Sequence, residues 1–289
     1  MGIFAVLRIQ STIFVYFCSL MEGKNKIHIE HPEAWELIVS IGGRQLNYIL
    51  YAPSVAGSLI IGDVPLADNS LQALEDAVYN TPELLNEYKR VKVTVHSQHF
   101  VLFSDMVADD DCLSFLPRVY PEDDGDVAVC ALPGHNTKIA WTMPSGMQAF
   151  LGRTFNYPAV CHHLAPMCAH FAELNAGAER SRMYVNMDDG SMDLAVYRDG
   201  ALQSVNSFPL ASHQDAVYYA LNTWDSHHLD QMTDEIQVMG ESEACAEIVP
   251  ELREFVKHVM PAVYPAAAMR LGRNAMQAPL ELILLALCE

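Results

Sequence analysis

The sequence predicts an α/β protein made of two similar lobes around a cleft. Its 289 residues are 51% apolar and 18% charged, which is enough apolar material for a large buried core. Two segments, one beginning at Val39 and the other at Val185, resemble each other. In both, three apolar runs separated by glycine-containing turns precede a helical pattern and a further apolar run. This repeated strand, strand, strand, helix, strand unit indicates two lobes built on one plan.

The repeat is clearest when its two copies are compared. The first reads VSIGGRQLNYILYAPSVAGSLIIGDVPLA and the second VNMDDGSMDLAVYRDGALQSVNSFPLA, so that Tyr51 aligns with Tyr197. Helices are expected in NSLQALEDAVYNTPELLNEY, capped by Asn69 or Ser70, and in SHQDAVYYALNTW, which begins at Ser212. RVKVTVHS and EIQVMGES are the strands that complete the two units.

The other segments are assigned to a first lobe, residues 30–175, and a second lobe, residues 176–289. Residues 105–126 contain DMVADDD and PEDDGD and are predicted to be an acidic insertion, a solvated loop. DVAVCALP is expected to be a strand, SGMQAFLGRTF a helix, and PAVCHHLAPMCAHFAELNA a strand followed by a bridging helix. AEIVPELREFVKHVMPAV is predicted to be helical with Pro250 in the first turn, and APLELILLALCE a buried segment packing back on the first lobe.

Residues 1–29 are interpreted as an extension before the first lobe. The first twenty residues are apolar, but Arg8, Gln10 and Thr12 interrupt the run and no basic region precedes it. A spanning helix needs roughly 20 apolar residues and a signal peptide needs a basic start, so neither interpretation fits. MEGKNKIHIEHPEAW would be an ordinary beginning, and we hypothesise that translation starts at Met21.

The charge balance excludes several classes of partner. Acidic residues number 36 and basic residues 17, giving a formal net charge of −19. No stretch gathers enough Lys or Arg to follow a phosphate backbone, so we expect no binding to nucleic acid and no membrane insertion. The seven cysteines form no CxxC pair, and a core of this size needs no disulfides. Reduced thiols and a cytoplasmic location are therefore expected.

Three further clusters do not fit the chemistry that they first suggest. The acidic run in residues 105–126 lacks the alternate spacing and closing Glu of a calcium loop. The cysteines and histidines of CHHLAPMCAH are not spaced as zinc ligands, so we expect core thiols and histidines at the seam between the lobes. DSHHLD, residues 225–230, is expected to be a polar loop, and no GxSxG motif occurs. We expect no metal ligands and no catalytic residues.

A duplicated unit of this kind resembles the actin-like ATPase superfold (ribonuclease H-like), which actin, Hsp70, sugar kinases and the bacterial proteins FtsA and PilM share. The chain more closely resembles an uncharacterised bacterial family, a domain of unknown function with this fold, whose members carry segments like FVLFSDM, CHHLAP and LILLALCE. The resemblance covers nearly all of residues 36–289. It implies the fold, whereas a superfold hosts many activities.

The resemblance also implies where a nucleotide would bind. In the superfold, two glycine-rich turns hold the phosphates through backbone N–H groups, and a third glycine pair lies near the adenosine. In the first turn, VSIGGR, Gly42 and Gly43 remain but Ser40 stands where Asp is usual. In the third, Gly240 is followed by Glu241 in place of a second glycine.

The second turn, NMDDGSMD, departs furthest from the superfold pattern. Asn186 replaces the usual Asp, and acidic residues replace glycines. Like charges about 4 Å apart repel by on the order of 1 kcal/mol in water and by several times more in a less polar cleft, so this turn would repel a triphosphate. Asp-Gly is also a favoured hairpin sequence. The degenerate nucleotide-site positions are Gly42, Gly43, Asp188, Asp189, Gly190 and Gly240.

These departures favour a non-catalytic interaction or scaffold protein that uses no cofactor. The resemblance to PilM-like proteins implies a protein partner. The alternative is an actin-like ATPase or small-molecule kinase that binds Mg-ATP in the cleft, with Asp188, Asp189 and Asp193 as candidate magnesium ligands. An open cleft with exposed Gly42 and Gly43 amides would favour the alternative, and a cleft filled by side chains would favour the scaffold.

Overall fold

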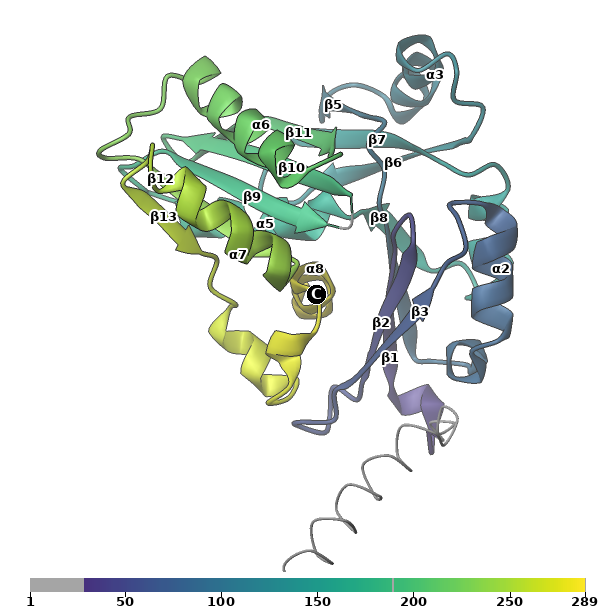
Figure 1. Ribbon diagram of the computed structural model, residues 1–289. Coiled ribbons are helices and arrows are strands. Elements are labelled where there is room, and N and C mark those ends of the chain that lie inside the picture. The colour runs from purple at the N-terminus through teal and green to yellow at the C-terminus, as the bar shows by residue number, and fades with distance from the viewer. Residues whose placement is uncertain (1–28, 189, 289) are drawn as a thin grey trace, which may run out of the picture.

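The computed structural model describes residues 29–188 and 190–288. The hypothesis about Met21 concerns residues 1–28, which lie outside this range. Two five-stranded sheets form the two sides of the molecule, and helices cover them (Figure 1). The fold is therefore the mixed α/β architecture that the repeat predicts.

The first sheet has the strand order β3-β2-β1-β4-β8. Its strands are β1 (Glu36–Ile41), β2 (Gln45–Tyr51), β3 (Ile60–Pro65), β4 (Arg90–Val95) and β8 (Ala159–His162). β1, β2 and β3 form an antiparallel meander, while β4 runs parallel to β1 and β8 parallel to β4. β1 is buried along its whole length because it lies at the centre of the sheet.

The second sheet repeats this arrangement, with the order β11-β10-β9-β12-β13. Its strands are β9 (Arg182–Asp188), β10 (Ser191–Arg198), β11 (Ala201–Pro209), β12 (Glu235–Gly240) and β13 (His258–Pro261). β9, β10 and β11 are again antiparallel, and β12 and β13 again add in parallel. The strands of both predicted units are confirmed.

The helix that follows each meander begins where the sequence indicates. α2 (Leu71–Tyr79) has Ser70 as its cap, whose side chain accepts a hydrogen bond from the backbone of Ala73. α6 (His213–Ser226) has a capping box in which Ser212 and Asp215 bond to each other's backbone N–H groups. Such caps satisfy N–H groups that have no partner within the helix. A short 3-10 turn, η1 (Pro32–Ala34), precedes the first unit, and another, η2 (Pro82–Leu85), connects α2 to β4.

The insertion in the first lobe is more ordered than predicted. A small sheet of β5 (Phe100–Ser104), β7 (Thr137–Met143) and β6 (Asp126–Leu132) carries a helix, α3 (Asp109–Val119), within the segment expected to be a solvated loop. The acidic run forms the first turn of α3, where carboxylates are stabilised by the helix dipole. Cys112 and Leu116, one turn apart, bury the inner face of the helix.

The second half of the chain also corrects a prediction. α7 (Ser242–Leu252) begins earlier than expected, so Pro250 lies near its end and not in its first turn. Proline cannot donate within a helix, and α7 ends two residues later. The continuation, predicted to be helical, instead forms β13, which pairs with β12. α4 (Met147–Thr154) and α5 (Leu164–Asn175) lie where helices are expected.

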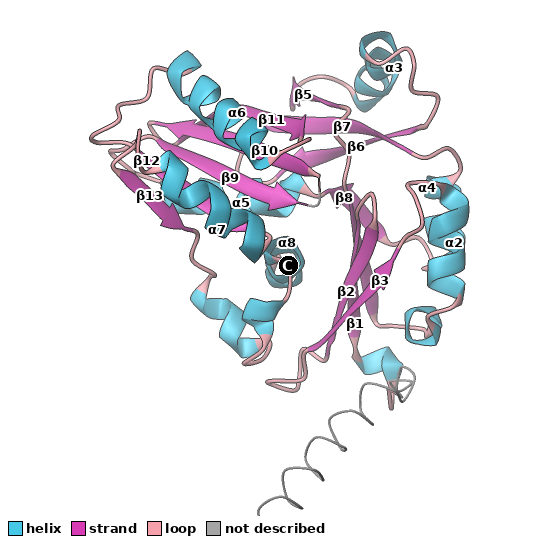
Figure 2. Ribbon diagram, viewed as in Figure 1, coloured by secondary structure: helices cyan, strands magenta, loops and turns pink. Residues whose placement is uncertain are grey.

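The final segment runs from β13 back across the molecule to the first lobe. It contains η3 (Ala266–Arg270), η4 (Ala275–Gln277) and α8 (Leu280–Leu287). Figure 1 shows α8 in the centre of the molecule, between the two sheets. Leu282, Ile283 and Leu285 join one buried cluster with Ile38 and Ile49 of the first sheet. Figure 2 shows α6 and α7 together on one face of the second sheet, where they complete its own core.

Candidate functional site

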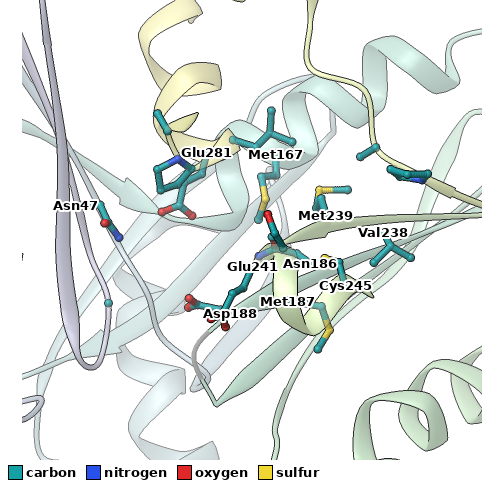
Figure 3. A pocket seen from close by; sticks show the side chains of 18 of the residues that line it. Asn47, Met167, Asn186, Met187, Asp188, Val238, Met239, Glu241, Cys245 and Glu281 are labelled. Carbon is teal, nitrogen blue, oxygen red and sulfur yellow. The ribbon is translucent and has the colours of Figure 1, made fainter. Parts of the chain in front are cut away.

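A cavity of about 1110 Å³ lies between the lobes, because residues of both sheets line it. The turn after β1, the end of β4, the ends of β9 and β12, α7 and residues 261–281 all contribute to its wall. Figure 3 shows the carboxylates of Asp188, Glu241 and Glu281 in this space, with Met167 and Met239 nearby. The cavity wall therefore combines carboxylates with methionine side chains.

Four of the six predicted nucleotide-site positions line this cavity, namely Gly42, Gly43, Asp188 and Gly240. Gly190 lies in the hairpin between β9 and β10, with a φ of 75°, and is not among the described residues of the cavity wall. Asp189 lies outside the described residues. Turns from three distant parts of the sequence therefore meet at one place.

His96 is the residue around which the site is organised. Its Nδ1 lies 3.0 Å from Oδ2 of Asp188, and its Nε2 lies 2.8 Å from Oε1 of Glu281. Because both ring nitrogens face carboxylate oxygens, both donate when the imidazole carries its positive charge. The Ser40 hydroxyl, 3.0 Å from Nε2, donates to the same oxygen of Glu281. His96 follows β4, so this network joins the first lobe, the second lobe and α8.

The environment of His96 favours its charged form. Burial alone would lower the pKa of the imidazole, but the negative charges of Glu281 and Asp188 and the hydrogen bonds to both outweigh it. The pKa of His96 is consequently held well above its usual value of 6.5. A buried imidazolium between two carboxylates is the electrostatic centre of the site.

A second histidine extends the network along the seam. The rings of His96 and His163 stack with centroids 4.1 Å apart and planes inclined by 8°. His163, at the start of α5, has its Nε2 2.9 Å from Oδ2 of Asp193 on β10, and Asn186 also donates to that oxygen. Burial would raise the pKa of Asp193, but the charge and hydrogen bond of His163, with bonds from Asn186 and Ser207, hold it below its usual value. His163 therefore lies at the seam between the lobes, as predicted for the histidines of CHHLAPMCAH.

A family model described as "Protein of unknown function (DUF3822)" matches residues 24–259. The chain belongs to this family. No curated protein matches the chain. Membership in the DUF3822 family does not by itself supply an activity.

Solved structures show the fold of this DUF3822 member. A Bacteroides thetaiotaomicron protein with an actin-like ATPase fold and unknown function is 19% identical with a TM-score of 0.75, and the match covers 92% of this chain and 100% of the other. The PilM-PilN type IV pilus biogenesis complex contains a chain that is 12% identical with a TM-score of 0.52, covering 89% of this chain and 98% of the other. At these identities the likeness establishes the actin-like ATPase fold.

The actin-like ATPase fold suggests Mg-ATP as a ligand, which would require oxygen ligands for magnesium at the cavity. Magnesium prefers oxygen ligands at about 2.1 Å in octahedral geometry. In this DUF3822 chain Ser40 and Asn186 offer neutral side chains at the two usual Asp positions, while Asp188 and Glu281 already accept from His96. Within residues 29–188 and 190–288 no group of three or more His, Cys, Asp or Glu side chains could hold a metal ion. Among the described residues, the two carboxylates nearest the turns are thus already paired with His96.

The contacts of Ser40, His96 and Asp188 have the order of a Ser-His-Asp triad, but not its chemistry. A general base must be neutral to take the serine proton, whereas the raised pKa of His96 favours its protonated form. Ser40 is only 1% exposed, and its hydroxyl donates to Glu281. In this DUF3822 member the constellation links β1, β4 and the second lobe.

The glycines of the DUF3822 site serve the backbone in different ways. The N–H of Gly42 donates to the carbonyl of Gln45 at 2.9 Å, which closes the turn between β1 and β2. Gly240 has a φ of 104°, and a Cβ there would lie 1.9 Å from the carbonyl oxygen of Met187. Gly43 has open space around it. Gly240 is therefore required by strand packing whether or not a ligand binds.

His96 and Glu281 are the site residues that sequence reasoning missed. His96 lies in RVKVTVHS, which reads as the end of a strand, and Glu281 lies in an apolar segment predicted only to be buried. Both side chains are largely buried, at 17% and 7% exposure. Glu281, the one charged residue in the apolar run LELILLAL, is the local signal, because buried carboxylates are nearly always paired.

No helix in the described ranges, 29–188 and 190–288, is long and apolar enough to span a membrane.

Proposed function

We propose that the chain is a non-catalytic interaction or scaffold protein of actin-like ATPase fold, in which the nucleotide site has become a charge network that joins the lobes. The observation that carries this proposal is His96, which lies between Asp188 and Glu281 at 3.0 and 2.8 Å. A carboxylate that accepts from a buried imidazolium is a poor metal ligand, because metal binding would leave the imidazolium without its partner. The proposed location is the cytoplasm.

A protein partner is the second part of the proposal. The similar chain that carries the name PilM is part of a complex with PilN, so this fold supports protein binding in at least one relative. Large methionine side chains are also exposed near the cavity, including Met276 at 61%. Methionine is adaptable and frequent at protein-binding surfaces.

Thermal unfolding of the full chain with Mg-ATP and Mg-ADP tests the first part. A ligand that binds only the folded state stabilises it by about 2.7 kcal/mol when present at 100 times its Kd. We expect no saturable rise in Tm at millimolar nucleotide, and no phosphate release. A magnesium-dependent rise that disappears with EDTA would contradict the proposal.

An Asp188→Asn variant is the matched control for that titration. It removes the carboxylate charge while keeping the shape of the side chain. If nucleotide raised the Tm of the wild type but not of Asp188→Asn, Asp188 would be a metal ligand. The contact between His96 and Asp188 would then belong to the nucleotide-free protein only.

One observation favours the second candidate, an ATPase or small-molecule kinase. The cavity is open, at about 1110 Å³, and Gly43 is exposed at its edge. A cavity of this size accommodates a nucleotide. Single-turnover phosphate release at stoichiometric enzyme distinguishes this candidate, because slow hydrolysis would still yield product.

A further inference from the structure

The segment that returns from the second lobe is basic, in a chain that is strongly acidic. Residues 255–280 contain Lys257, Arg270 and Arg273 and no Asp or Glu, although the chain has 36 acidic residues. Both arginines are exposed. We call this stretch the basic segment. Its net charge is opposite in sign to that of the rest of the molecule.

The basic segment also exposes large apolar side chains. Val263 is 80% exposed, Met276 61% and Met269 56%. The loop before β3 adds Val55, because that loop bonds to the segment through Gly57 and the carbonyl of Arg270. Apolar side chains that gather with charges of one sign are typical of interaction surfaces.

The insertion in the first lobe carries the complementary surface. Residues 105–124, the acidic segment, hold seven acidic residues and one basic residue. Met106 is 91% exposed, and Phe115 and Val119 on α3 are also exposed. Phe115 and Val119 are four residues apart and therefore share a helix face with Asp111.

The two segments lie at opposite ends of the molecule. Figure 1 shows α3 at the top and the turns of residues 266–277 at the bottom. One chain cannot bring its own two segments together. We propose that the basic segment of one copy docks on the acidic segment of a second copy, giving head-to-tail self-association.

The geometry determines the kind of assembly. A contact between two different surfaces of the same chain is heterologous, so it leaves one free end on each outer copy and adds further copies. Contacts between two short surface segments are typical of weak interfaces, so the expected association is concentration-dependent. The inference does not depend on whether the interlobe cavity binds nucleotide.

Sedimentation velocity of the full chain tests the proposal, from about 5 to about 200 μM protein, a range that covers weak interfaces. The buffer contains about 150 mM salt, which screens the long-range repulsion between chains of net charge −19 to a Debye length of about 8 Å. We expect the weight-average sedimentation coefficient to rise with concentration. A monomer at every concentration would overturn the proposal.

Charge-reversal variants identify the surfaces. Arg270→Glu with Arg273→Glu, and separately Asp110→Lys with Asp111→Lys, should each remain monomeric at about 200 μM, the concentration chosen above for a weak interface. Each variant alone then carries two ends of like charge, whereas in an equimolar mixture both ends of one variant are complementary to the ends of the other, so association should return. Association in the mixture cannot arise from a general loss of folding. Variants that sediment like the wild type, or a mixture that stays monomeric, would overturn the proposed head-to-tail contact.

A chain carrying all four reversals provides a second check. Its two ends are complementary again with exchanged signs, so open-ended association should return. The substituted side chains are all exposed, and circular dichroism of each variant confirms that it is folded. Failure of the folded fourfold variant to associate would show that charge complementarity does not drive the contact.

Discussion

The two glycines at the edges of the cavity, Gly43 and Gly240, differ in what the backbone requires of them. Both belong to the degenerate nucleotide-site positions, yet only Gly240 combines a φ of 104° with a close backbone neighbour. A side chain there would need both a rare conformation and a displacement of β9. At Gly43 neither constraint applies, because a Cβ would have nothing within 4 Å.

We therefore expect Gly240→Ala to lower the free energy of unfolding by at least about 3 kcal/mol, since a strained backbone and a steric conflict add together. Gly43→Ala should change it by no more than about 0.5 kcal/mol. Urea unfolding followed by tryptophan fluorescence measures both. Equal effects would mean that the two glycines have the same role.

α8 is the element that completes the site, because it brings Glu281 to His96. A buried lysine on β4 holds its other end: Lys92 donates to the carbonyl of Leu285 at 3.0 Å and also to that of Cys288. Cations near a helix C-terminus interact favourably with its dipole. Burial lowers the pKa of Lys92, although the carboxylate of Glu36 opposes this effect.

Lys92→Met should loosen α8 without removing any side chain of the cavity. Hydrogen bonds from a charged group contribute about 1.5–3 kcal/mol, so amide exchange in residues 280–287 should accelerate by roughly 10- to 100-fold. Hydrogen exchange with mass spectrometry measures this change. Lys138→Met is the control, because Lys138 pairs with Asp109 on α3 and should leave exchange in α8 unaltered.

At the level of elements, the sequence predicts what local patterns determine. Alternation and glycine turns locate the strands of both units, and Ser70 and Ser212 mark where α2 and α6 begin. α3 was not predicted, because an acidic run looks like a solvated loop until its buried face is known. β13 was not predicted either, since its strand character depends on pairing with β12 and not on its own short sequence.

The candidate site also combines features that local sequence patterns reveal with features that depend on distant residues. Glycine-containing turns could be located from the repeat, and four of the six positions line one cavity. His96 could not be recognised, because Ser40, Asp188 and Glu281 are distant from it in sequence and no local pattern connects them. Long-range pairing of single polar residues leaves no periodic signal for sequence analysis to detect.

For the whole molecule, the His96 network makes the stability of the junction between the lobes depend on pH. The folded pKa of His96 is raised above its unfolded value of about 6.5. Its contribution to stability is therefore fully present below pH 6.5 and is lost as pH rises through the folded pKa. Alkaline pH should weaken the junction between the lobes while leaving each sheet intact.

The test compares the wild type with His96→Gln from pH 5 upward. The glutamine leaves Glu281 buried without its cation, so the variant should be less stable by about 3–5 kcal/mol at pH 5 to 6.5. The difference in Tm should shrink as pH rises above 6.5. A difference that is constant with pH would show that His96 contributes by packing and not by charge.

The contact between Ser40 and Glu281 spans 241 residues of sequence. Contacts of such separation form late in folding, because closing the intervening chain costs entropy that no local contact repays. Each meander and its helix can assemble earlier from residues that are near one another. We therefore expect the network to form after the two meanders during refolding.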